Sequence, residues 1–130
     1  MAEYSVPPSM DDIAELAEAA LAEIPDALRE RVRGVSILVE DAADDQPLRE
    51  LELDNAWDLT GLYRGVPFGE GAALRHAPDT ILLYREPILL EWIETGDHLA
   101  RLVRTVLIHE IAHHFGFDDA EIARLEAEGA

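Results

Sequence analysis

The segment from about His98 to Phe115 constrains the fold of this chain more than any other. Its apolar residues fall on much of the circumference of a helix, and a helix that is apolar nearly all round belongs in the interior of a domain. Gly116 follows, and a glycine in the left-handed conformation commonly ends a helix. We therefore predict a buried central helix and a sharp turn at Gly116. Its apolar residues are Leu99, Leu102, Val103, Val106, Leu107, Ile108, Ile111 and Ala112.

The last turns of this helix carry the pattern His-Glu-x-x-His, at His109, Glu110 and His113. Residues four apart lie on the same face of a helix, so both imidazoles can meet one metal ion. This pattern is typical of zinc hydrolases, most often peptidases. Glu110 is rotated by about 100° from His109, which suits it to act on a water molecule rather than to bind the metal.

A catalytic zinc ion needs three protein ligands and one position open for water. The chain can reverse cheaply at Gly116, and Asp119 lies three residues beyond the turn, where its carboxylate can supply the third ligand. Asp118 is the neighbouring alternative, which the residues alone leave open. We predict one zinc ion held by His109, His113 and Asp119, with Glu110 as the general base.

The chain is strongly acidic, with 28 Asp and Glu against 10 basic residues and a formal net charge of −18. Such a field disfavours binding to a phosphate backbone, so nucleic acid is not an expected partner. The absence of cysteine excludes disulfides, thiolate catalysis and Cys-ligated zinc. Residues 1–10 lack a basic region followed by an apolar run, and no stretch approaches a membrane span. We therefore expect a cytoplasmic location and no membrane partner.

Shorter patterns predict the remaining elements. Residues 1–8 are expected to form a flexible lead, and residues 9–130 a single domain. The acidic segment 40–58 reads as a solvated loop with a short turn of structure, and a loop with Gly and Pro follows at 66–78. Helices are predicted over residues 9–24, 25–32, 87–93 and 119–128, and strands over 35–39, 59–64 and 80–84.

With these elements placed, the chain resembles the small bacterial minimal zincins, compact members of the zincin-like metallopeptidase class. The most specific part of the resemblance is the C-terminal motif HExxHxxGxxD, which here ends at Asp119. Two further segments also look like this family. The residues that carry the resemblance are His109–Gly116 with Asp119, Gly61–Pro67 and Ile81–Ile88.

The resemblance implies an α+β, zincin-like fold, in which a small mixed β-sheet of about three to four strands packs on helices around a central HExxH helix. It also implies zinc ligation by His109, His113 and Asp119, with Glu110 as the base. In zincins an edge strand beside the metal pairs with the extended substrate, and the strand at 80–84 is the candidate here.

These observations predict a zinc-dependent peptidase that acts on a peptide or protein substrate, with a regulatory protein partner as one means of restraint. The main alternative is a non-catalytic metal-binding interaction protein that retains the fold, and a third is a hydrolase of non-peptide amides.

Tyr63 and Tyr84 end predicted strands, where a phenol can stabilise an oxyanion or simply pack in the sheet. His114 is predicted to point away from the metal.

Overall fold

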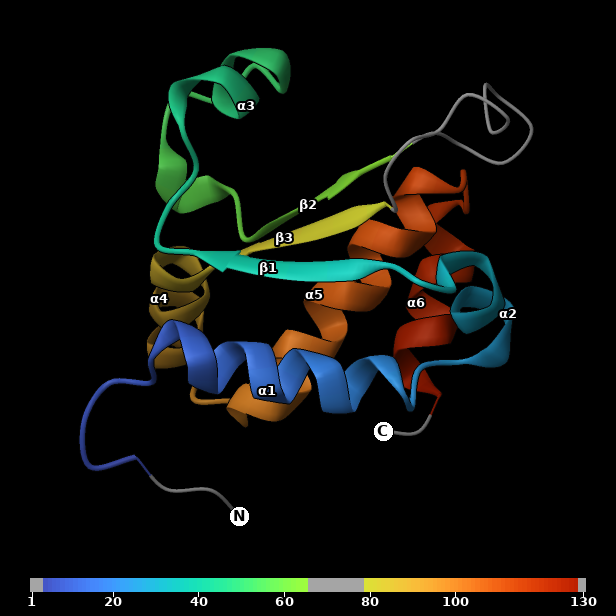
Figure 1. Cartoon of the computed structure of the whole chain (residues 1–130), viewed down its shortest axis with the longest axis horizontal. Helices are drawn as coiled ribbons and strands as arrows, with labels where there is room; N and C mark the ends of the chain where they lie inside the picture. Colours follow the sequence, from blue (N-terminus) through green and yellow to red (C-terminus); the bar gives the residue numbers. More distant parts are fainter. Residues whose placement is uncertain (1–3, 66–78, 129–130) are drawn as a thin grey trace.

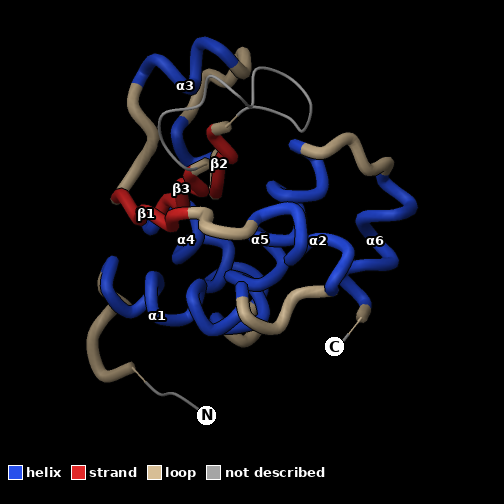
Figure 2. Tube along the Cα trace, turned by 45° about the vertical axis from the view of Figure 1, so that its right-hand side comes forward, coloured by secondary structure: helices blue, strands red, loops and turns tan. Residues whose placement is uncertain are grey.

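The computed structural model describes residues 4–65 and 79–128, so the predicted loop at 66–78 lies outside the described residues. Helices α1 and α5 lie on one side of a three-stranded sheet, and α3 lies on the other (Figure 1). Helix α6 lies beside α5 (Figures 1 and 2). The helices are α1 (Met10–Leu21), α2 (Asp26–Arg29), α3 (Asp45–Glu50), α4 (Arg85–Thr95), α5 (Leu99–His114) and α6 (Asp119–Ala127), with 3₁₀ turns η1 (Glu30–Val32) and η2 (Ala56–Asp58).

The sheet has the strand order β1-β3-β2, with β1 at Ser36–Glu40, β2 at Gly61–Arg64 and β3 at Thr80–Tyr84. Strand β1 pairs with β3 in parallel, and β2 pairs with β3 antiparallel. This arrangement confirms the predicted small mixed sheet and the α+β class.

The prediction that residues 80–84 form an edge strand is wrong, because β3 is paired on both sides. Its sequence, Thr-Ile-Leu-Leu-Tyr, is apolar at successive positions rather than alternating, and such a run is typical of a strand that is covered on both faces. Among the described strands, β2 and β1 form the edges.

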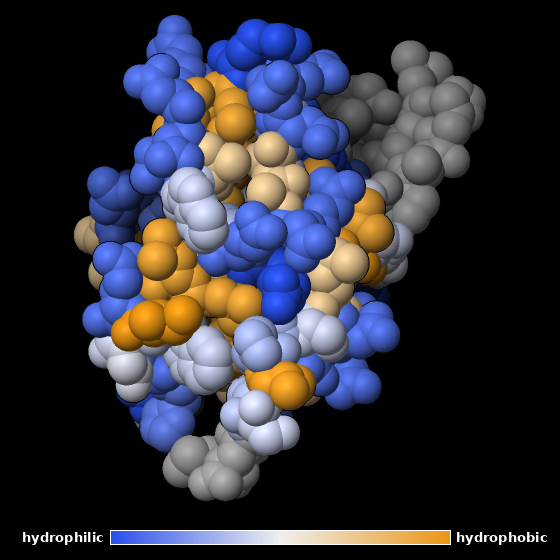
Figure 3. All heavy atoms as spheres, turned by 90° about the vertical axis from the view of Figure 1, so that its left-hand side faces the viewer, coloured by the Kyte–Doolittle hydropathy of each residue, from blue (hydrophilic) through white to orange (hydrophobic). Residues whose placement is uncertain are grey.

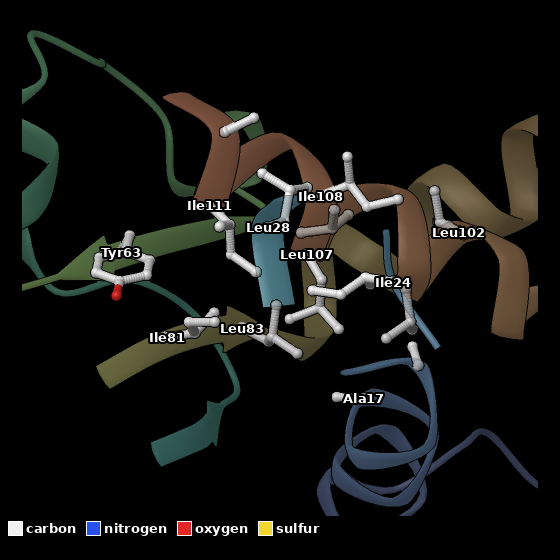
Figure 4. Close-up of a cluster of buried hydrophobic side chains, with 14 of the residues drawn as sticks. Ala17, Ile24, Leu28, Tyr63, Ile81, Leu83, Leu102, Leu107, Ile108 and Ile111 are labelled. Carbon is white, nitrogen blue, oxygen red and sulfur yellow. The ribbon is translucent and has the colours of Figure 1, made fainter. Parts of the chain in front are cut away.

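Helix α5 agrees with the predicted long helix to within one residue at each end. Its predicted apolar residues are all buried, and the helix packs against α1, α6 and β2. Leu107 and Ile111 of α5 point toward Ile81 and Leu83 of β3, and Ile108 is buried in the same core (Figure 4). This packing fixes the side of α5 that faces the sheet and therefore the side that is left for His109 and His113.

The acidic segment 40–58 contains more structure than one turn, because α3 and η2 both lie within it. Most of its charged side chains are exposed, as predicted.

Figure 3 shows the side of the molecule that carries α3 and α4, where hydrophilic surface surrounds smaller apolar areas. Leu90 and Ile93 of α4 are among the exposed apolar residues. No helix in the described part of the chain is long and apolar enough to cross a membrane.

Candidate metal centre

The end of α5 places His109 and His113 side by side. Their ring centroids are 4.4 Å apart, and the ring planes are inclined by 52°. The helix ends at His114, and the chain turns at Gly116, whose φ of 82° is accessible to glycine at little cost. Two backbone hydrogen bonds close the turn, one from the N–H of Gly116 to the carbonyl of His113 (3.1 Å) and one from Phe117 to Ala112 (2.9 Å). The turn directs the following residues back over the histidines.

Asp118 and Asp119 have different surroundings after this turn. The Asp118 carboxylate accepts a hydrogen bond from the N–H of Glu121 (2.8 Å), and the Asp118 N–H donates to the Glu121 side chain (3.1 Å), so Asp118 caps α6. The Asp119 side chain is fully exposed, and its Oδ1 lies 4.0 Å from Nε2 of His113. Of the two aspartates, Asp119 has the carboxylate without a capping role.

The predicted ligands approach one another without closing on a single point. Two ligand atoms on one tetrahedral zinc stand about 3.4 Å apart, somewhat less than the 4.0 Å between His113 and Asp119. Within residues 4–65 and 79–128, no group of three or more His, Asp or Glu side chains is gathered closely enough to hold a metal ion. The donor set of two imidazoles and an exposed carboxylate nevertheless suits zinc, and a solvent-exposed Asp119 can move toward the histidines at low cost.

Glu110 is half-buried, and its side chain lies against the sheet. A Cβ added at Gly61 of β2 would lie 3.2 Å from Cγ of Glu110, which shows how closely the strand approaches this side chain. Burial raises the pKa of Glu110 to about 7, against a smaller lowering by His109. A carboxyl group in such surroundings can exchange a proton near neutral pH.

In the zinc-free protein, Glu110 should make the stability depend on pH. Its pKa rises from 4.5 to about 7 on folding, so the folded protein holds a proton that the unfolded chain releases between these values. We expect this group to lower the free energy of unfolding by on the order of 2–3 kcal/mol as pH rises through that interval. Denaturant unfolding of the zinc-free wild type and of Glu110→Gln measures the effect. The variant should lack this part of the pH dependence, and equal pH dependences would contradict the assignment.

The close approach of β2 to α5 requires a residue without a side chain at position 61. A Cβ there would lie 2.9 Å from Cγ1 of Val106 and 3.3 Å from the carbonyl oxygen of Leu82. We expect Gly61→Ala to destabilise the protein by about 1–3 kcal/mol through overpacking. Thermal unfolding checks this, with Gly34→Ala as a comparison in which the new Cβ meets open space but the φ of 76° is strained. An unchanged melting temperature in Gly61→Ala would show that α5 and β2 can separate without cost.

The buried residues Tyr63 and Asp79 form a separate group with the half-buried His114. The Tyr63 hydroxyl donates to Oδ2 of Asp79 (2.6 Å), and its ring stacks on His114 with centroids 4.0 Å apart. His114 therefore packs against the sheet rather than against the other two histidines, as predicted. Tyr63 and Tyr84 are both buried, which agrees with their interpretation as packed sheet residues.

One residue near the histidines was missed by the sequence patterns. Oε1 of Glu126, on α6, lies 3.3 Å from Nδ1 of His109. The sequence could have indicated Glu126 through its distance of seven residues from Asp119. Residues seven apart lie on the same face of a helix, two turns from each other.

Comparison with known proteins identifies the family of the chain and a structure with a similar fold. A family model described as zincin-like metallopeptidase matches residues 32–129. A solved structure of a conserved hypothetical protein from T. thermophilus is similar to this chain, with 25% sequence identity and a TM-score of 0.52, over 89% of this chain and 99% of that chain. No curated protein matches. The family match includes the whole sheet, α5 and α6, and the chain belongs to the zincin-like metallopeptidase family.

Proposed function

We propose that this protein is a zinc-dependent peptidase, in which His109, His113 and Asp119 hold one zinc ion and Glu110 acts as the general base. The observation that carries the proposal is the return of α6 over the HExxH face of α5, with Asp119 Oδ1 4.0 Å from Nε2 of His113. Membership of a family of zincin-like metallopeptidases supports metal-dependent peptide hydrolysis as the activity. The capping role of Asp118 favours Asp119 as the third ligand.

The zinc ion and Glu110 would have different roles in hydrolysis. Zinc, when bound, supplies a Lewis-acidic centre that polarises the peptide carbonyl and lowers the pKa of a water molecule. The Glu110 carboxylate accepts a proton from the attacking water and then delivers it to the nitrogen of the leaving amine. Its Cγ lies against Gly61 of β2, and His109 is close enough to act on the pKa of its carboxyl group.

The substrate strand is assigned to β2 in place of β3. Among the described strands, β2 pairs only with β3, and its Gly61 lies against α5 at Glu110. An extended peptide that adds to the edge of β2 opposite β3 would therefore pass near the general base. The net charge of −18 favours a peptide or protein substrate with basic residues.

A metal-binding interaction protein without turnover is the second candidate. It is favoured by the spacing of the ligands, because no three of these groups in the described segments already share one point. In that case the site would bind zinc for stability or for a protein partner.

Peptide-library cleavage with removal and return of zinc separates the two candidates. The protein is stripped with a chelator, incubated with the library, and incubated again after one equivalent of zinc is restored, with magnesium as the control ion. We expect defined cleavage products only with zinc. Stoichiometric zinc binding without any cleavage would overturn the peptidase proposal and leave the interaction protein.

A further inference from the structure

Helix α6 brings two carboxylates, not one, to the histidine face. Asp119 and Glu126 lie seven residues apart, on the same face of α6. Because α6 runs back along α5, Asp119 meets His113 and Glu126 meets His109. Each carboxylate of α6 is thus matched with one histidine of α5.

The two carboxylates approach different nitrogen atoms. Asp119 lies 4.0 Å from Nε2 of His113, whereas Glu126 lies 3.3 Å from Nδ1 of His109. An ionised carboxylate only accepts hydrogen bonds, so His109 must carry its proton on Nδ1 when it contacts Glu126. A neutral imidazole protonated on Nδ1 has its lone pair on Nε2, which is the atom then able to bind a metal.

Arg104 fixes the end of α6 that carries Glu126. Its guanidinium donates to the backbone carbonyl of Glu126 (3.2 Å) and to that of Glu128. A cation at this position also interacts favourably with the C-terminal end of a helix. Arg104 lies on α5, five residues before His109, so one helix holds both the histidine and the segment that supports it.

We propose that Glu126 is a positioning residue, which holds the Nδ1–H of His109 and presents Nε2 to zinc, and that Arg104 keeps Glu126 in place. This inference rests on the proposed zinc site, because it assigns His109 as a ligand. Carboxylates that orient a ligating histidine typically change metal affinity by about 10- to 100-fold when they are removed.

The tautomer of His109 tests the contact without any metal. Long-range ¹⁵N–¹H correlation spectra of the zinc-free protein, recorded at alkaline pH where imidazoles are neutral, report which ring nitrogen carries the proton. We expect the Nδ1–H form in the wild type, a shift toward the Nε2–H form in Glu126→Leu, and recovery in Glu126→Gln, whose side-chain oxygen still accepts. A wild type in the Nε2–H form would overturn the proposal.

Zinc affinity, measured by competition with a chromogenic chelator, tests the consequence. We expect Glu126→Leu to weaken binding by about 10- to 100-fold, and Arg104→Met to weaken it less. Glu128→Leu is the matched control, because its exposed side chain carries the same charge while only its backbone carbonyl contacts Arg104. Thermal unfolding shows whether Glu126→Leu is folded. If it is not, the zinc affinity of the milder variant Arg104→Met tests the proposal instead.

The outcomes separate this inference from the proposed function. Unchanged zinc affinity in Glu126→Leu, with zinc-dependent cleavage retained in the wild type, would overturn the role of Glu126 alone. Weakened affinity in Glu126→Leu, in a wild type that binds zinc but cleaves no peptide, would support Glu126 and overturn the peptidase proposal. A wild type that binds no zinc would overturn the peptidase proposal, and the tautomer would still decide whether Glu126 orients His109.

Discussion

Glu110→Gln should lower kcat/KM for peptide cleavage by about 10²–10⁴-fold, the range that general acid–base catalysis contributes. Glutamine has the size of glutamate and fits beside Gly61, but it cannot accept the proton of the attacking water. Because Glu110 is not a proposed ligand, zinc affinity should stay within about threefold of the wild type. Cleavage of a peptide selected from the library, together with a zinc titration, measures both quantities.

Glu94→Gln provides the control, because it makes the same substitution at an exposed position on α4. It should leave both cleavage and zinc binding at the wild-type level. Activity in Glu110→Gln within tenfold of the wild type would remove Glu110 from the mechanism and require another base.

Asp119→Ala should weaken zinc binding by at least about 10- to 100-fold, because the loss of a ligand should cost no less than the loss of a supporting residue. The Asp119 side chain is fully exposed, so the substitution should leave the folded structure and its melting temperature nearly unchanged. Chelator competition and thermal unfolding are measured on the same samples.

Asp118→Ala should show the reverse pattern. Loss of the α6 cap should lower stability by about 0.5–2 kcal/mol, and zinc affinity should change much less than in Asp119→Ala. If Asp118→Ala loses zinc and Asp119→Ala does not, the third ligand is Asp118 and the beginning of α6 rearranges on metal binding.

Much of this fold could be predicted from local patterns. The all-round apolar sequence of α5 predicted its burial, and the glycine at its end predicted the turn. The HExxH spacing indicated a shared helix face for His109 and His113 before their rings were seen to lie 4.4 Å apart. These features depend on residues close in sequence, which is why the chain alone reveals them.

Features that depend on contacts between helices and strands were harder to predict from the sequence. The placement of β3 between two strands is a property of the sheet, and a short apolar run does not say which neighbours it has. The contact of Glu126 with His109 joins residues 17 positions apart and depends on the register of α6 against α5. The sequence alone leaves Asp118 open as an alternative to the predicted ligand Asp119, because a shift of one residue at the start of α6 exchanges the capping and the exposed position.

A crystal structure of the zinc-loaded protein, with anomalous scattering to locate the ion, tests the proposed metal centre. We predict one zinc bound by Nε2 of His109, Nε2 of His113 and a carboxylate oxygen of Asp119, with its fourth position taken by solvent within hydrogen-bond reach of Glu110. A fourth protein side chain on the zinc, or a zinc bound elsewhere, would contradict it.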